Sequence, residues 1–280
     1  MVKSRLDVLL VQKGLAESRT RAQALVMEGK VRVDGQVETK ASRQVSAEAS
    51  VEVEAPPRFV SRGGEKLEGA FRLWGSEEVR VKSEELRMAN SSDSHKDVGH
   101  HNSSLFTLHS SLDVVGKTCI DVGSSTGGFT DCLLQHGAEF VMAVDVGTNQ
   151  LAYKLRVDPR VWVKENYNAR YMTAADLPRV PEVAVTDVSF ISLELILPPI
   201  NNVLASGGRI VALIKPQFEV GKGGAPGGLV KSEELRVKSV EKIVSFGKEK
   251  LGLELLGLEQ SPIRGKEMGN VEYLSYWRKP

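Results

Sequence analysis

The 280-residue sequence lacks the features that would direct it out of the cytoplasm or into a membrane. It has only two cysteines, Cys119 and Cys132, which are too few for a disulfide framework and are typical of buried, reduced thiols. Its first residues contain no apolar run followed by a small-residue cleavage site, so we expect no signal peptide. No stretch approaches the roughly 18 uninterrupted apolar residues of a membrane span. We therefore expect a cytoplasmic protein with no membrane partner.

The chain also lacks a strong net charge, since 37 lysines and arginines face 36 acidic residues. The charge is unevenly distributed, however, because residues 1–45 hold nine basic residues against five acids. Such a bias suits contact with nucleic-acid phosphates. For any one basic residue, a solvated charge on a helix surface is an equally good explanation. The candidate RNA contacts are Arg5, Arg19, Arg21, Lys30 and Arg32.

The first 57 residues predict a small α+β domain. Residues 5–13 and 18–28 place apolar side chains at helical spacing, and a glycine follows each segment. Alternating valines then lead into Asp34-Gly35, a strong signal for a two-residue hairpin. Further short β segments end before the prolines at 56 and 57, which are typical of a domain boundary. We therefore predict one domain over 1–57 and a second over 58–280.

The second domain predicts an α/β fold, because strands alternate with helices from residue 118 onward. Apolar runs such as FVMAV and RIVALI are typical of strands buried on both faces, and therefore of a mostly parallel sheet covered by helices. Seven strands are expected, at 118–122, 139–144, 161–164, 183–186, 209–214, 253–258 and 272–278. Helices are expected at 130–136, 193–204 and 233–251.

Residues 76–112 interrupt this pattern. They are polar and serine-rich, they hold four of the five histidines, and their VKSEELR segment recurs at 230–236. We expect an inserted, largely disordered linker whose two ends lie near each other, and a helical second copy of the repeated segment. A solvated loop explains the histidines better than a metal site, because no fixed ligand spacing accompanies them.

A glycine-rich loop follows the first strand of the second domain, in the stretch IDVGSSTGGFT. Glycines allow a tight turn and a close approach to a ligand, and the helix that follows offers free N–H groups. Asp145 ends the next strand, where a carboxylate can bind ribose hydroxyls, although a turn cap would explain it alone. The spacing differs from G-x-G-x-x-G, and Asp121 before the loop disfavours a pyrophosphate. S-adenosylmethionine is therefore favoured over a dinucleotide. The candidate cofactor residues are Asp121, Gly123, Ser125, Gly127, Gly128 and Asp145.

Two further polar residues, Asp187 and Lys215, lie just beyond the ends of buried strands, where open α/β sheets place their ligands. A lysine that extends to solvent from the rim of the sheet is the alternative explanation for Lys215. Lys66 and Glu272 carry no signal when taken alone.

These motifs together resemble the TlyA (hemolysin A) family of ribosomal RNA 2′-O-ribose methyltransferases, whose catalytic domain is similar to the FtsJ group. The similar blocks include SRTRAQALVMEGKVRVDG, FVSRGGEKLEGA, DVGSSTGGFTDCLLQHGA, VTDVSFISL, LIKPQFEVGKGG and GNVEYL. The resemblance implies a Rossmann-like methyltransferase fold and an N-terminal RNA-binding domain similar to that of ribosomal protein S-four. It also implies a cofactor contact in segment 166–170, at Asn168. Its catalytic tetrad falls on Lys66, Asp187, Lys215 and Glu272.

The function implied by this resemblance is S-adenosylmethionine-dependent methylation of a ribose 2′-hydroxyl in ribosomal RNA, on cytidine, with ribosomal RNA or ribosomal subunits as partners. Lys215 is expected to be the base, because the like charge of Lys66 and burial favour its neutral amine. Asp187 would orient Lys215 and stabilise developing charge, Glu272 would position Lys66 or the ribose, and no metal is needed. Two alternatives are a membrane-active hemolysin and a non-catalytic RNA-binding assembly factor.

Overall fold

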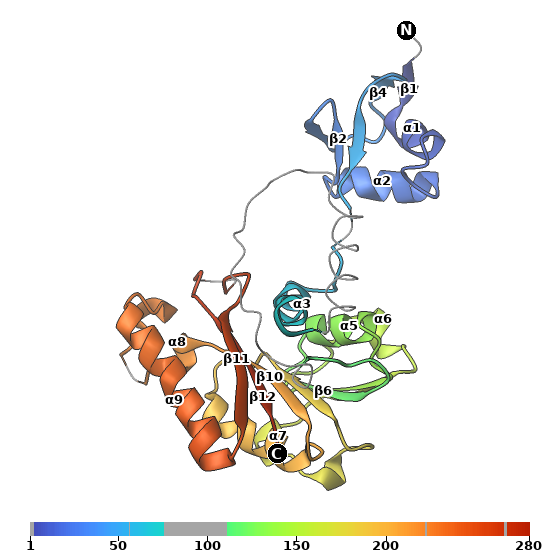
Figure 1. Ribbon diagram of the computed structural model, residues 1–280. Helices are drawn as coiled ribbons and strands as arrows, with labels where there is room; N and C mark the ends of the chain where they lie inside the picture. The colour runs from blue at the N-terminus through green and yellow to red at the C-terminus, as the bar shows by residue number, and fades with distance from the viewer. Residues whose placement is uncertain (1–2, 56, 76–110, 222, 266–267) are drawn as a thin grey trace. The chain divides into compact units, whose positions relative to one another are not determined.

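The structure is a computed structural model that describes residues 3–55, 57–75, 111–221, 223–265 and 268–280 (Figure 1). The chain divides into two compact units, Met1–Pro57 and Arg58–Pro280. Among the described residues, no helix combines the length and the apolar character needed to cross a membrane.

The first unit packs two helices against short antiparallel strands. Asp34 and Gly35 both have positive φ, the backbone that a two-residue hairpin needs, so the predicted hairpin is confirmed. The core of the unit is formed by leucines and valines from both helices and from the strands. The elements are β1 (Lys3–Arg5), α1 (Leu6–Gln12), α2 (Arg19–Met27), β2 (Val31–Val33), β3 (Gln36–Glu38), β4 (Gln44–Ser46) and β5 (Val51–Val53). Strand β1 pairs with β4, and β2 lies between β3 and β5.

The second unit is a seven-stranded sheet between two layers of helices, which confirms the predicted fold class. Its strands are β6 (Thr118–Val122), β7 (Phe140–Val144), β8 (Val161–Lys164), β9 (Val183–Thr186), β10 (Arg209–Ile214), β11 (Glu254–Gln260) and β12 (Tyr273–Arg278). Its α-helices are α3 (Gly63–Trp74), α5 (Gly128–Gln135), α6 (Tyr153–Arg156), α7 (Leu197–Val203), α8 (Pro216–Glu219) and α9 (Glu233–Leu251). Short 3₁₀ turns include η1 (Ala169–Tyr171), η2 (Ala174–Asp176), η3 (Leu193–Leu195) and η4 (Pro226–Gly228).

The strand order is β11-β12-β10-β9-β6-β7-β8, and β12 runs antiparallel to both of its neighbours while the other pairs are parallel. Successive side chains alternate between the faces. In β10, Val211 and Leu213 share a core cluster with residues of α3 and α5, whereas Ile210 and Ala212 share one with residues of α7 and α9. From β6 the chain adds β7 and β8 on one side, and it then returns to place β9 on the other side of β6. This reversal of direction leaves a crevice at the carboxyl ends of β6 and β9.

Local differences from the predicted elements have physical reasons. The single helix predicted over 193–204 is wrong, because the chain forms η3 and then starts α7 afresh with prolines in the first turn. The repeated segment at 230–236 is helical only from Glu233, since Ser232 caps α9 by accepting from the Leu235 N–H.

The two ends of the predicted insertion lie side by side, as expected. The backbone N–H of Leu112 donates to the carbonyl of Trp74 at 2.6 Å, and Gly75 and Leu112 form an isolated bridge. Residues 76–110 lie outside the described residues. The predictions of a disordered linker and of solvated histidines fall on this segment.

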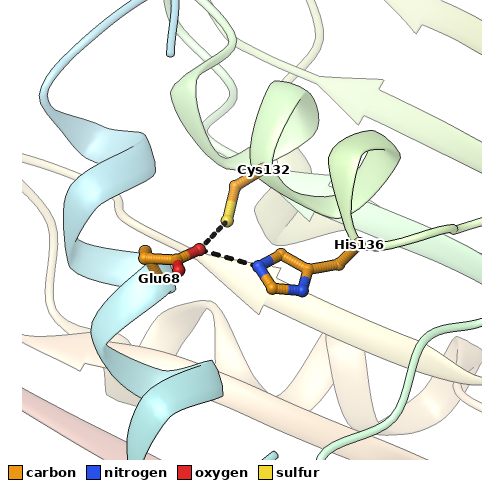
Figure 2. A group of neighbouring side chains, drawn as sticks. All are labelled: Glu68, Cys132 and His136. Atoms are coloured by element: carbon orange, nitrogen blue, oxygen red, sulfur yellow. Dashed lines mark hydrogen bonds and ion pairs between the residues drawn. The ribbon is translucent and has the colours of Figure 1, made fainter. Parts of the chain in front are cut away.

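A buried charge network joins α3 to α5 (Figure 2). The carboxylate of Glu68 lies 2.7 Å from His136 Nε2 and 2.8 Å from an Arg58 guanidinium nitrogen, and the Cys132 thiol donates to it at 3.9 Å. The His136 ring also stacks on Phe71. Burial opposes ionisation of Glu68, but the hydrogen bonds from His136 and Arg58 outweigh it and lower its pKa to about 2. Glu68, Cys132 and His136 are side chains that could ligate a metal, but the Glu68 carboxylate already has three partners, which are His136, Arg58 and the Cys132 thiol.

Glu68→Ala should lower the free energy of unfolding of the second unit by about 3–5 kcal/mol, because it leaves the partly buried Arg58 charge without its partner. The stabilisation should be complete above pH 4.5, the ordinary pKa of the group, and should be lost as the pH falls toward 2. Urea unfolding followed by tryptophan fluorescence measures this unit alone, because all three tryptophans lie within it.

The matched control is Glu234→Ala, which removes an exposed carboxylate paired with Lys238 and should leave the unfolding midpoint unchanged. A loss in Glu68→Ala no larger than in this control would show that the buried network does not hold the two helices together.

Candidate functional site

A pocket of about 610 Å³ lies at the carboxyl ends of β6, β7 and β9. Loops after these strands line it, together with the segment that leads into η1. Four of the predicted cofactor residues are part of its wall, namely Gly123, Ser125, Asp145 and Asn168. The pocket therefore coincides with the crevice that the strand order creates.

The glycine loop lines this pocket, and steric constraints fix the shape of its backbone. Gly123 has a φ of +84°, and a Cβ atom there would lie 2.8 Å from the Val188 side chain. Ser125 also adopts a positive φ, and its N–H donates to Asp145 at 2.7 Å. The loop is thus held in a shape that brings its backbone close to any bound ligand.

Asp145 connects the loop to the end of β7. Its second carboxylate oxygen accepts from the Gly147 N–H at 2.7 Å, so the turn-capping role considered from the sequence is present. A carboxylate offers about four acceptor positions, and two are used. Two acceptor positions therefore remain for a ligand at the pocket wall.

Three other predicted cofactor residues, Asp121, Gly127 and Gly128, do not line the pocket. Asp121 is fully buried behind the loop and accepts from both the N–H and the hydroxyl of Thr130, in the first turn of α5. Burial raises the pKa of Asp121 to about 7, against the opposing effect of these hydrogen bonds. Gly128 lets α3 approach α5, since a Cβ atom there would meet Ser61 Oγ at 2.3 Å. These residues shape the loop from behind.

The four predicted catalytic side chains meet beside the pocket. Asp187 lies between the two lysines, with one carboxylate oxygen 2.6 Å from Lys215 Nζ and the other 3.3 Å from Lys66 Nζ. Glu272 lies 2.8 Å from Lys66 Nζ. Asp187 also lines the pocket, so the charged cluster and the pocket share a wall. The structure therefore brings together residues that are up to 206 positions apart, as 272 − 66 shows.

This cluster is nearly dry. The exposed fractions are 9% for Lys66, 7% for Lys215 and 3% for Glu272. Two positive and two negative groups balance one another, which offsets the cost of burying them. Lys66 comes from α3, Asp187 follows β9, Lys215 follows β10 and Glu272 precedes β12.

Two residues that line the pocket, Ser189 and Phe190, were missed by the sequence analysis. Ser189 accepts a hydrogen bond from Lys215 Nζ at 2.8 Å. Phe190 is 84% exposed, has a φ of +63°, and its ring lies 5.1 Å from that of Phe218. The sequence offered one signal for them, a polar and an aromatic residue shortly after Asp187. Their contacts, with Lys215 and with Phe218 on α8, depend on tertiary packing and are not visible in the sequence.

In the first unit, two predicted RNA contacts are already engaged. The guanidinium groups of Arg5 and Arg19 bind the buried carboxylate of Asp7 at 3.0 and 2.9 Å. Hydrogen bonds from Arg5, Gln23 and Arg19 hold the pKa of Asp7 well below its usual range, although burial opposes this. Arg5 and Arg19 therefore help to hold the fold, and both side chains also remain partly exposed.

The other three candidates are freer. Lys30 pairs with Glu28 at 2.6 Å, and Arg32 donates to the carbonyl of Gly35 at 3.2 Å, in partly or fully exposed positions. Arg21 is exposed on α2. These side chains remain available to an outside anion.

Comparison with known proteins finds a matching family for each unit. The FtsJ-like methyltransferase family matches residues 105–279, and the S4 domain matches residues 4–51. The 16S/23S rRNA (cytidine-2′-O)-methyltransferase TlyA of Mycobacterium tuberculosis is 38% identical over 99% of this chain and 90% of its own length. Hemolysin A of Brachyspira hyodysenteriae is 37% identical over 98% of this chain and 99% of its own.

A solved structure from Streptococcus thermophilus is similar over 100% of this chain and 89% of its own, with 38% identity and a TM-score of 0.65. The resemblance seen in the sequence is thereby confirmed. With an S4 domain, an FtsJ-like methyltransferase domain and such relatives along nearly its whole length, the chain belongs to the TlyA (hemolysin A) family.

Proposed function

We propose that this protein transfers a methyl group from S-adenosylmethionine to a ribose 2′-hydroxyl of ribosomal RNA, on cytidine. The observation that carries the proposal is the cluster of Lys66, Asp187, Lys215 and Glu272, which adjoins the pocket through Asp187. The named reaction of the Mycobacterium tuberculosis relative supports the choice of RNA and nucleoside.

The pocket fits the cofactor. Its volume of about 610 Å³ lies within the usual range for small-molecule sites, which is about 300–1,000 Å³. Asp145 has free acceptor positions for ribose hydroxyls, and the backbone of Gly123 allows close approach. S-adenosylmethionine, when bound, supplies an electrophilic methyl group on a sulfonium.

The residues of the cluster supply the proton chemistry. A ribose hydroxyl is a weak nucleophile at neutral pH and must lose its proton as the O–CH₃ bond forms. Lys215 Nζ accepts that proton. Asp187 holds the amine in place and stabilises the ammonium that results, while Lys66 stays charged beside the reacting oxygen.

The contacts explain why Lys215 and not Lys66 is the base. Lys66 touches two carboxylates, those of Asp187 and Glu272. Lys215 touches one carboxylate, which it shares with Lys66, and a neutral hydroxyl. Of the two buried amines, Lys215 therefore has fewer charged partners, which suits it to accept a proton.

The exposed ring of Phe190 completes the proposal. An aromatic face that is open to solvent at the pocket mouth suits stacking with an unpaired base. The S4 domain contributes affinity for RNA through its basic side chains.

Asp145→Ala should weaken the binding of S-adenosylmethionine by about 1–3 kcal/mol, because a charged acceptor is lost and the N–H groups of Ser125 and Gly147 lose their partner. Calorimetry on the purified chain measures this affinity, with NAD as a ligand expected not to bind. Asp158→Ala, which removes a carboxylate paired locally with Arg160, is the control and should bind normally. Clear binding of NAD without S-adenosylmethionine binding would overturn the cofactor assignment.

Lys215→Ala should abolish methyl transfer to RNA while cofactor affinity survives. Lys215→Arg should be equally inactive, since a guanidinium stays protonated at any working pH. Lys66→Ala should be less severe and should move the pH–rate profile to higher pH, because the like charge that favours the neutral amine is gone. Transfer of a labelled methyl group to ribosomal RNA measures the activity of all three variants. Near-normal activity in Lys215→Arg would rule out Lys215 as the base.

Replacing Arg21, Lys30 and Arg32 together with alanine should weaken RNA binding and flatten its salt dependence. For each of these side chains that truly binds a phosphate, the slope of log affinity against log salt should fall by about 0.7–0.9. A control triple variant removes Lys238, Lys248 and Lys250 from the exposed face of α9 and should keep the slope. An equal slope in both variants would place the RNA elsewhere.

A further inference from the structure

The amine of Lys215 has two close neighbours. It forms an ion pair with Asp187 Oδ1 at 2.6 Å and donates a hydrogen bond to Ser189 Oγ at 2.8 Å. Ser189 follows Asp187 by two residues, so both partners come from one loop after β9. The proposed reaction uses the carboxylate but gives the hydroxyl no task.

The loop that carries Ser189 is fixed at both ends. At its start, Asp187 is held by the two lysines. At its end, the buried carboxylate of Glu219 accepts from the Ser192 hydroxyl at 2.6 Å and from the Leu193 N–H at 2.8 Å.

Between these ends, Phe190 contacts the ring of Phe218 on α8. Helix α8 directly follows Lys215, so the loop and the lysine are anchored to the same short segment. The Ser189 hydroxyl therefore sits on a fixed frame and not on a free surface turn.

This frame has a stereochemical consequence for a base. A neutral amine has two N–H bonds and one lone pair, and it turns freely about its Cε–Nζ bond unless both hydrogens are held. Asp187 alone fixes one direction, and it divides its carboxylate between two lysines. A second acceptor in a different direction fixes the rotation and leaves a single direction for the lone pair.

We propose that Ser189 is a positioning residue that holds the Lys215 amine in the rotation in which its lone pair faces the acceptor hydroxyl. The inference rests on the proposed function, in which Lys215 is the base. It assigns the hydroxyl a role in the rate of transfer and none in binding either the cofactor or the RNA. Alignment of reacting groups is worth large factors in rate, since a displacement of about 1 Å can cost about 100-fold.

Steady-state kinetics on the full chain, with ribosomal RNA and S-adenosylmethionine, test this inference. Ser189→Ala should lower kcat by about 10- to 100-fold while the KM for RNA and the Kd for the cofactor stay within about twofold. Ser189→Thr keeps a hydroxyl and should recover most of the rate. Ser206→Ala makes the same change at an exposed serine whose hydroxyl donates to the carbonyl of Pro280, and it should behave as wild type.

Three results would overturn the inference. Ser189→Ala could turn over at the wild-type rate, it could raise KM with kcat unchanged, or the threonine variant could lose as much rate as the alanine variant. Retained cofactor affinity in the same samples separates these results from misfolding. A wild-type chain that transfers no methyl group would refute the proposed function itself, and with it the role of Lys215 on which Ser189 depends.

Discussion

The position of Asp187 between two buried lysines is the constraint on which the site depends. One carboxylate holds an amine from α3 and an amine from the end of β10, and Glu272 completes the charge balance from the other side of Lys66. Four distant segments must therefore converge to within hydrogen-bond distance. The sheet makes this possible, because β9, β10 and β12 are neighbours and their relevant ends meet at one edge. Any one of the four groups left alone at this depth would be an uncompensated charge, which is costly to bury.

Helix α3 is the one participant that does not belong to the sheet, and it is held from two sides. Lys66 points into the charged cluster, and Glu68, two residues later, binds Arg58 and His136 on the side of α5. The approach of the two helices is close because glycines lie where they meet: a Cβ atom at Gly128 would collide with Ser61 and with the backbone of Gly64. Gly128 thus serves the helix contact, whereas a Cβ atom at Gly127 would meet Leu151 and Leu155. The pocket itself is lined by Gly123 and Asp145. The glycine loop and Lys66 are therefore coupled through packing.

The sequence predicts most of this arrangement, and the failures follow from tertiary contacts. Strands such as Arg209–Ile214 are recognisable because burial on both faces leaves an uninterrupted apolar run. Lys66 and Glu272 carry no local signal, since their roles arise from the partners they meet in space, and only the resemblance to a family identified them. The partners of Asp121 were not predictable from its place beside the glycine loop, because its side chain accepts hydrogen bonds from Thr130 within the fold. The ion pairs of Arg5 and Arg19 were not predictable either, because nothing in the sequence shows that Asp7 is buried beside them.

The contrast between the dry cluster and the open mouth explains how one site handles a charged reaction on a large substrate. Lys66, Lys215 and Glu272 are shielded from water, so their electrostatic interactions are stronger than they would be at a surface. Phe190 and Ser189, only a few residues from Asp187, are exposed. The loop that joins these two environments is exposed in its middle, so burial cannot hold it there. It is held at its ends instead, by the ion pair of Asp187 with Lys215 and by the hydrogen bonds of Ser192 and Leu193 to Glu219. The positive φ of Phe190 is the local cost of this path, of order 1–2 kcal/mol, and the contact with Phe218 together with the two anchors holds the residue there.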